Sequence, residues 1–228
     1  MSRINAGVML KLGWETLRAS NARFLLNIFG FPLLLTLGLW AFFSFKAALV
    51  VVAVQVGIFF FVLAVTATQL EKLADIRLEP WPLRSAVNRD QITRLAGDLA
   101  RLGFVPAGMY RVSGRDLFTE VYAHPGYKIY AMITSGTEDT DAYVEFSSDY
   151  RDGGNYCVGG GRMGAALPRP ANMVQFNYPG KSTEELLGIH LRCRPDYGLL
   201  DTPPENFLQS FEKGQAKMMD YLFKRARD

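Results

Sequence analysis

Apolar positions dominate the chain between residues 24 and 70, where two long runs are separated by a short link. Residues 24–43 and 47–70 carry no charged side chain, and Lys46 is the only charge between them. A helix rises about 1.5 Å per residue, so either run is long enough to cross a hydrocarbon core of about 30 Å. The pattern therefore predicts a transmembrane helical hairpin over residues 24–70, with its helices at 24–43 and 47–68.

Small residues follow one face of each predicted span, with Gly38 in the first and Ala53 and Gly57 in the second. Because small side chains let helix backbones approach closely, we expect these two faces to contact each other. Gln55 lies about 160° from the centre of the second face on a helical wheel. Its amide needs a hydrogen-bond partner, and two interpretations stay open: a bond inside the hairpin, or contact with another integral membrane protein.

Basic residues flank the outer ends of both predicted spans, whereas the link offers only Lys46. The positive-inside rule then places both termini in the cytoplasm, in an integral protein of a plasma or inner membrane. Residues 1–23 carry apolar and charged side chains at helical spacing, which predicts an amphipathic helix at the interface with Trp14 at headgroup level. The expected partners are therefore the lipid bilayer and other integral membrane proteins.

Residues 71–88 are predicted to form a connector, interrupted by a Pro-Trp-Pro motif around Trp81. Trp81 is expected to pack at the membrane surface or beneath the following domain. A helix with one apolar face is predicted from Asn88 or Asp90, either of which can cap it, to Gly103, which ends it.

Aromatic and β-branched segments separated by turn residues follow this helix and predict strands. These segments are 108–112, 117–123, 128–134, 142–150, 155–158 and 172–178. Short connections favour antiparallel neighbours, and the alternation of apolar with polar residues predicts one face packed on helices and one partly wet.

Two helices are predicted to close the chain, one after a capping box from Ser182 to Glu185 and one after Pro203 and Pro204. The predicted fold class is therefore α+β: a two-helix transmembrane hairpin followed by a soluble cytoplasmic domain over residues 89–228, in which helices flank an antiparallel β-sheet.

Charge and cysteine content narrow the functional classes. The net charge is +3, and most of this excess lies before residue 24, so the soluble part is nearly neutral. A nucleic-acid-binding protein normally presents a basic surface, so no nucleic-acid partner is expected. The two cysteines, Cys157 and Cys193, lack metal-ligand or redox spacing and are interpreted as free thiols in a reducing compartment.

Motifs that would indicate catalysis are incomplete. Residues 159–164 match G-x-G-x-x-G, but the prolines that follow prevent the helix that would hold a phosphate, so we interpret the segment as a hairpin loop. Ser147, Ser148 and Asp149, with His124 or His190, contain the letters of a triad without the G-x-S-x-G elbow. The acidic turn around Asp141 lacks calcium-loop spacing. No metal or cofactor is predicted.

Two functional hypotheses follow. The leading one is a non-catalytic accessory or scaffold subunit of a membrane protein complex, with a cytoplasmic protein-interaction domain and Gln55 as the main contact. The alternative is a membrane-tethered enzyme or small-ligand sensor that uses the polar face of the sheet. Its candidate residues are His124, Tyr143, Glu145 and Arg162. A pocket that gathers these side chains would favour the alternative.

Overall fold

A computed structural model describes residues 36, 46, 49–58, 60–61, 76–81, 88–113, 117–136, 141–161 and 168–227. Residues Asp75–Met163 and Arg169–Met219 form one compact unit, and the remaining residues form a second. We call the first the sheet unit, because it contains every described strand.

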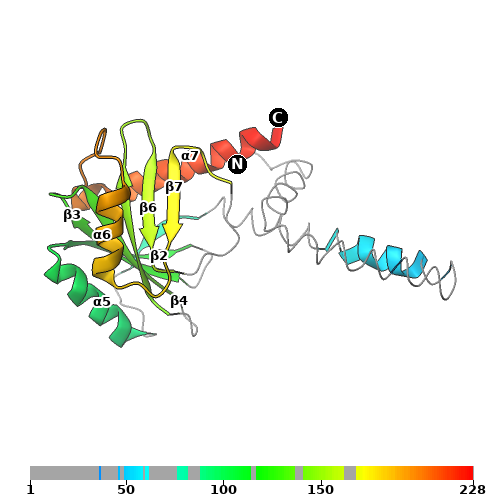
Figure 1. The fold of residues 1–228 in the computed structure, drawn as a ribbon, viewed down its shortest axis with the longest axis horizontal. Helices are drawn as coiled ribbons and strands as arrows, with labels where there is room; N and C mark the ends of the chain where they lie inside the picture. The colour runs from blue at the N-terminus through cyan, green and yellow to red at the C-terminus, as the bar shows by residue number, and fades with distance from the viewer. Residues whose placement is uncertain are drawn as a thin grey trace. The chain divides into compact units, whose positions relative to one another are not determined.

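The sheet unit is built on a seven-stranded mixed sheet whose strands lie in chain order (Figure 1). The strands are β1 (Leu78–Pro80), β2 (Val105–Val112), β3 (Leu117–His124), β4 (Ile129–Gly136), β5 (Tyr143–Asp149), β6 (Asn155–Gly159) and β7 (Met173–Asn177). Neighbours are antiparallel from β1 to β6, whereas β6 and β7 are parallel. The predicted strand segments are confirmed, but the expectation of a purely antiparallel sheet is wrong.

The parallel pair reflects the length of the connection between β6 and β7. Tight turns force antiparallel pairing, whereas a connection of about a dozen residues can return the chain to the end where the previous strand began. Residues 160–172 are long enough for that return. Glycines in this stretch resemble turn residues, which is why the sequence predicted a hairpin loop.

Strand β5 gives the sheet two chemically different faces. Val144 and Phe146 are buried on one face, and Glu145 and Ser147 alternate with them toward the other. Across the sheet Ser147 lies opposite Tyr130, which keeps the same alternation in β4. The predicted alternation is confirmed.

Helices cover both faces of the sheet (Figure 1). Helices α5 (Arg89–Arg101) and α6 (Thr183–Cys193) pack on the Phe146 face, and the first part of α7 (Phe207–Arg227) packs on the Tyr130 face. The short 3₁₀ helix η2 (Pro204–Asn206) leads into α7 at the prolines that predicted a helix start.

Side-chain hydrogen bonding confirms the predicted start of α6 but does not cap α5. The Ser182 hydroxyl accepts from the Glu185 amide at 3.2 Å, and the Glu185 carboxylate accepts from the Ser182 amide at 2.9 Å, which confirms the capping box. Asn88 is the N-cap of α5, with a positive φ of 58° and no side-chain cap bond. Gly103 follows α5 at φ +85°, a left-handed conformation that suits glycine.

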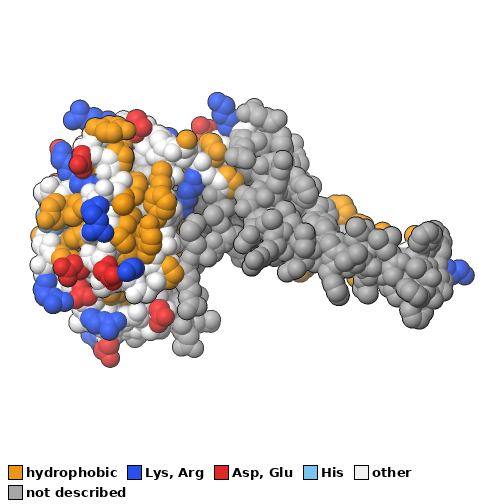
Figure 2. Space-filling view, in the orientation of Figure 1, with side chains coloured by type: hydrophobic (Ala, Val, Ile, Leu, Met, Phe, Trp, Pro, Cys, Tyr) orange, Lys and Arg blue, Asp and Glu red, His pale blue; other side chains and the backbone are white. Residues whose placement is uncertain are grey.

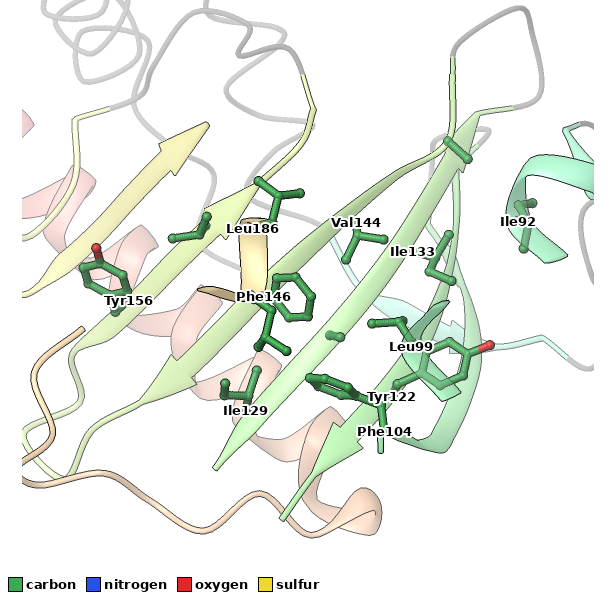
Figure 3. Close-up of a cluster of buried hydrophobic side chains, with 14 of the residues drawn as sticks. Ile92, Leu99, Phe104, Tyr122, Ile129, Ile133, Val144, Phe146, Tyr156 and Leu186 are labelled. Atoms are coloured by element: carbon green, nitrogen blue, oxygen red, sulfur yellow. The ribbon is translucent and has the colours of Figure 1, made fainter. Parts of the chain in front are cut away.

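The main hydrophobic core lies between the sheet and helices α5 and α6 (Figure 3). Leu99 of α5 and Leu186 of α6 point toward Phe146 and Ile133 of the sheet, and all four are 2 % exposed or less. Burial of each such side chain contributes about 1.5–3 kcal/mol. On the outer surface, acidic and basic side chains are interspersed over the face shown in Figure 2.

Strand β1 lies within the predicted connector and pairs with β2. Directly after it, the Trp81 amide donates to the Met109 carbonyl at 2.8 Å. The Trp81 ring packs against Phe118 at 6.1 Å between centroids, with the Arg111 guanidinium 5.6 Å from the ring centre. Trp81 therefore packs within the sheet unit, which is one of the two placements expected for it.

The transmembrane hairpin predicted over residues 24–70 is a wrong assignment of the fold. Within the described parts of the chain, no helix combines the length and apolar character needed to cross a membrane.

Other predictions for this region have different outcomes. Gln55 Nε2 donates to Thr36 Oγ1 at 3.0 Å, a bond between the two apolar runs. Ala53 and Gly57 are helical, and a Cβ at Gly57 would meet nothing within 4 Å. The interfacial segment 1–23 with Trp14, and Gly38, lie outside the described residues.

Candidate functional site

A cavity of about 420 Å³ lies between the Tyr130 face of the sheet and helix α7. Its wall is built from β4, β5, β6, β7 and the helix, all within the sheet unit. The volume falls in the range of small-molecule sites. The side chains that line it divide into a polar wall on the sheet and a largely apolar wall on the helix.

The polar wall follows from the two-residue period of the strands. Glu145, Ser147 and Asp149 occupy alternate positions of β5, so their side chains share one face. On the next strand, Asn155 lies opposite Asp149 and Cys157 lies opposite Ser147. The pairing therefore places five polar side chains side by side on the cavity wall.

Asn155 joins these side chains into one network. Its Nδ2 donates to Ser147 Oγ and to Asp149 Oδ1, each at 2.7 Å, and its Oδ1 accepts from Cys157 Sγ at 2.7 Å. The Ser210 hydroxyl of α7 donates to Asp149 Oδ2. Both carboxylate oxygens of Asp149 are thus engaged, and Asp149 connects helix α7 to the sheet.

Glu145 lies at the other end of the polar wall. Its Oε2 accepts from Gln175 Nε2 of β7 at 3.0 Å. Desolvation raises the pKa of Glu145, and the positive field of Arg169 opposes this shift without reversing it. Glu145 forms no ion pair within the described residues. A carboxyl group in this state favours either a proton or a cationic partner.

Cys157 is a buried thiol and is 6 % exposed. Desolvation, together with the negative field of Glu145, raises its pKa well above the usual value. The thiolate is the reactive form of cysteine, so this thiol stays protonated and unreactive at neutral pH. Cys157 contributes a hydrogen-bond donor to the wall.

The helix contributes the apolar wall and one glycine. Phe207, Phe211 and Met218 line the cavity from α7, with Met173 from β7. Gly214 lies among them, and a Cβ at this position would meet no atom within 4 Å. Glycine inside a helix costs about 1 kcal/mol relative to alanine, yet here it leaves space open in the cavity.

Basic side chains line the cavity as well. Arg169 and Lys213 are exposed, whereas Lys217 donates to the carbonyl oxygens of Asp152 and Gly153 at 3.2 and 2.8 Å. The cavity therefore carries charges of both signs. Its carboxyl groups lie on the sheet wall, and its basic side chains are either exposed or bound to a turn.

The four side chains expected at a ligand site are not gathered in this cavity. Glu145 lines it. Tyr143 is two residues away on the same face of β5, and desolvation and the field of Glu145 raise its pKa. His124 stacks on Tyr127 at 4.1 Å between centroids and accepts from the Tyr127 amide at 3.1 Å, which makes it part of a turn. Arg162 lies outside the described residues.

Ser148 and His190 form a hydrogen-bonded pair that superficially resembles a catalytic one. Ser148 Oγ lies 2.9 Å from His190 Nε2, donates to the Lys128 carbonyl oxygen and accepts from Arg194. Both side chains are 0 % exposed, and Asp149 lies on the opposite face of the sheet. Desolvation and the charge of Arg194 lower the pKa of His190 to about 3. The pair is a structural contact of the core.

The described residues include part of the glycine-rich motif and most of the acidic, His and Cys side chains of the sheet unit. No group of three or more His, Cys, Asp or Glu side chains in these parts of the chain is placed to hold a metal ion. In the glycine-rich motif, Gly159 ends β6, and a Cβ at Gly161 would lie 2.9 Å from the Tyr143 ring. Close packing on Tyr143 therefore explains Gly161.

Sequence reasoning missed Asn155, Cys157, Ser210 and Gly214 as cavity residues. The sequence gives only a weak indication of the two helix residues. Ser210 and Gly214 are four residues apart, on the same side of a helix whose neighbouring positions are apolar. No family model, curated protein or solved structure matches this chain.

Proposed function

We propose that the sheet unit is a small-ligand-binding domain whose site is the cavity between the sheet and helix α7. The observation that carries this proposal is a cavity of about 420 Å³ with a polar network on one wall and apolar side chains on the other. Sites of this composition bind small molecules by burying an apolar body and orienting a few polar groups.

Binding without catalysis fits the chemistry of the wall better than an enzyme does. Cys157 is held as a thiol, and Asp149 is satisfied by Asn155 and Ser210. The histidine nearest to a serine hydroxyl is buried in the opposite core. The role supported by these contacts is recognition of a ligand, as in a sensor.

Filling the cavity tests the proposal. Gly214→Leu places a branched side chain in space that is open in the wild type, while leucine suits a helix better than glycine. We expect the variant to fold and to lose binding of prodan, an uncharged naphthalene fluorophore whose emission shifts in apolar surroundings. The loss should be at least 10-fold in Kd, measured by fluorescence titration of the full chain.

Gly97→Leu is the matched control. Gly97 is also a helical glycine at which an added Cβ would meet no atom within 4 Å, but it lies exposed on α5. This variant should bind prodan like the wild type. Unchanged binding by Gly214→Leu, or absence of prodan binding by the wild type, would remove the cavity as a ligand site.

A second candidate function is an accessory or scaffold subunit that associates with a bilayer or with integral membrane proteins. The observation in its favour is the apolar surface of the described helical residues 49–58 and 60–61. Val50, Val54 and Phe61 are 63 %, 56 % and 69 % exposed. Large exposed apolar surfaces mark interaction sites.

This second function predicts that polar substitutions on that surface release the chain from its partners. Val50→Asn with Val54→Asn should shift the protein from a membrane or high-mass fraction to a smaller species in mild detergent. The size of the complex is measured by light scattering after gel filtration. The same distribution for variant and wild type would argue against this role.

A further inference from the structure

We propose that the cavity ligand is a small organic amine, whose ammonium group meets Glu145 while its apolar body lies against helix α7. This inference rests on the proposed ligand site and adds the chemical class of the ligand. Three features of the cavity indicate this class: the carboxyl group that is free of an ion pair among the described residues, the weak competition from nearby basic side chains, and the apolar wall of the helix.

The two carboxyl groups of the sheet wall differ in their availability. Asp149 accepts from Asn155 on one oxygen and from Ser210 on the other, so it is occupied in holding α7 on the sheet. Glu145 accepts from the neutral amide of Gln175 and has no ion-pair partner among the described residues. Glu145 is therefore the carboxyl group that a cationic ligand can neutralise.

The basic side chains around the cavity compete only weakly with a cationic ligand for Glu145. Arg169 and Lys213 are exposed, and solvent and salt screen exposed charges over a few ångströms. Lys217 is directed to the carbonyl oxygens of the turn at Asp152 and Gly153. A ligand ammonium beside Glu145 would form a charge-assisted hydrogen bond in a desolvated environment, where such bonds are strongest.

The opposite wall suits an apolar body attached to that ammonium. Phe211 and Met218 of α7 face the cavity with Met173 of β7, and Gly214 leaves the space between them open. Methionine side chains adapt to ligands of different shape. An aryl- or alkyl-substituted amine combines the required cation with the required apolar part.

Three ligands of similar size and different charge test this assignment: 2-phenylethylammonium, its uncharged counterpart 2-phenylethanol, and the anion 3-phenylpropanoate. Each is titrated calorimetrically into the full-length protein at pH 7. We expect the amine to bind at least 10-fold more tightly than the alcohol, and the carboxylate to bind more weakly than both.

Glu145→Gln keeps the size of the side chain and removes its charge, so it should abolish the preference for the amine and leave the alcohol affinity within about 3-fold of the wild type. Glu184→Gln, on the exposed surface of α6, is the matched control and should retain the preference.

The outcomes separate this inference from the proposed function. If prodan binds but the amine does not, if the alcohol binds as tightly as the amine, or if the preference survives Glu145→Gln, the amine assignment is overturned and the ligand site stands. Tighter binding of 3-phenylpropanoate would show that Arg169, Lys213 and Lys217 select an anion instead. If prodan also fails to bind, or binds Gly214→Leu unchanged, the proposed site itself fails.

Discussion

Residues on the two faces of β5 lie in different environments. Glu145 and Ser148 are only three positions apart, yet one borders a cavity and the other is 0 % exposed in the core. The Ser148 hydroxyl donates to the Lys128 carbonyl, so we assign the Nε2 hydrogen to His190, which donates it to Ser148. Nδ1 is buried and has no hydrogen-bond acceptor beside it among the described residues, so His190 is neutral in the native state, with its single hydrogen on Nε2.

The neutrality of His190 predicts how stability depends on pH. Its pKa is lowered to about 3 in the fold, whereas an unfolded histidine takes up a proton below about pH 6.5. Below that pH the unfolded state binds more protons than the native state, so this group removes stability as pH falls from 6.5 toward 3. Between pH 7 and pH 5 the loss amounts to about 2 kcal/mol.

Urea unfolding at pH 7, 6 and 5 measures this effect. His190→Gln cannot take up a proton, so its free energy of unfolding should fall less than that of the wild type over this range, whatever its stability at pH 7. Equal pH slopes for the two proteins would contradict a neutral, buried His190.

At the scale of elements, helices α6 and α7 both stabilise the sheet unit, but only α7 encloses the cavity. Leu186 of α6 packs in the core with Phe146. Phe207 of α7 packs against Tyr110 and Tyr130, with centroids 5.6 and 5.2 Å apart, and lines the cavity. The two helices therefore make separable contributions to stability and binding.

A pair of truncations tests this separation. Phe207→Ala should lower the free energy of unfolding by about 3–5 kcal/mol, and Leu186→Ala by about 2–5 kcal/mol, because each removes a buried apolar side chain. At a temperature at which both variants remain folded, only Phe207→Ala should weaken prodan binding. Equal loss of binding in the two variants would show that the cavity depends on overall stability alone.

At the scale of the whole molecule, the candidate site combines segments that are distant in the chain. Ser210 of α7 reaches Asp149 of β5, and Gln175 of β7 reaches Glu145. The parallel placement of β7 beside β6 brings Gln175 level with Cys157. An antiparallel return would give β7 a different register, so the mixed topology is part of the site.

Local patterns in the sequence were sufficient for most elements of the sheet unit. Alternation in residues 142–147, turn residues between the strands and the capping box at Ser182 depend on neighbours within a few positions. Glu145 was recognised as a ligand-site candidate because strand period alone places it on the polar face. The membrane hairpin predicted from apolar run length is not supported, because no helix within the described part of the chain is long and apolar enough to cross a membrane.

Tertiary structure alone decided the parallel pairing of β7, the face of the sheet that α7 covers, and which face of β5 borders the cavity. Each depends on contacts between residues far apart in sequence, for which local periodicity carries no information. Ser148 and His190 carry letters of a catalytic triad, but burial, hydrogen bonding and the charge of Arg194 make them core residues. Ser210 and Gly214 become site residues only because α7 lies across the polar wall of the sheet.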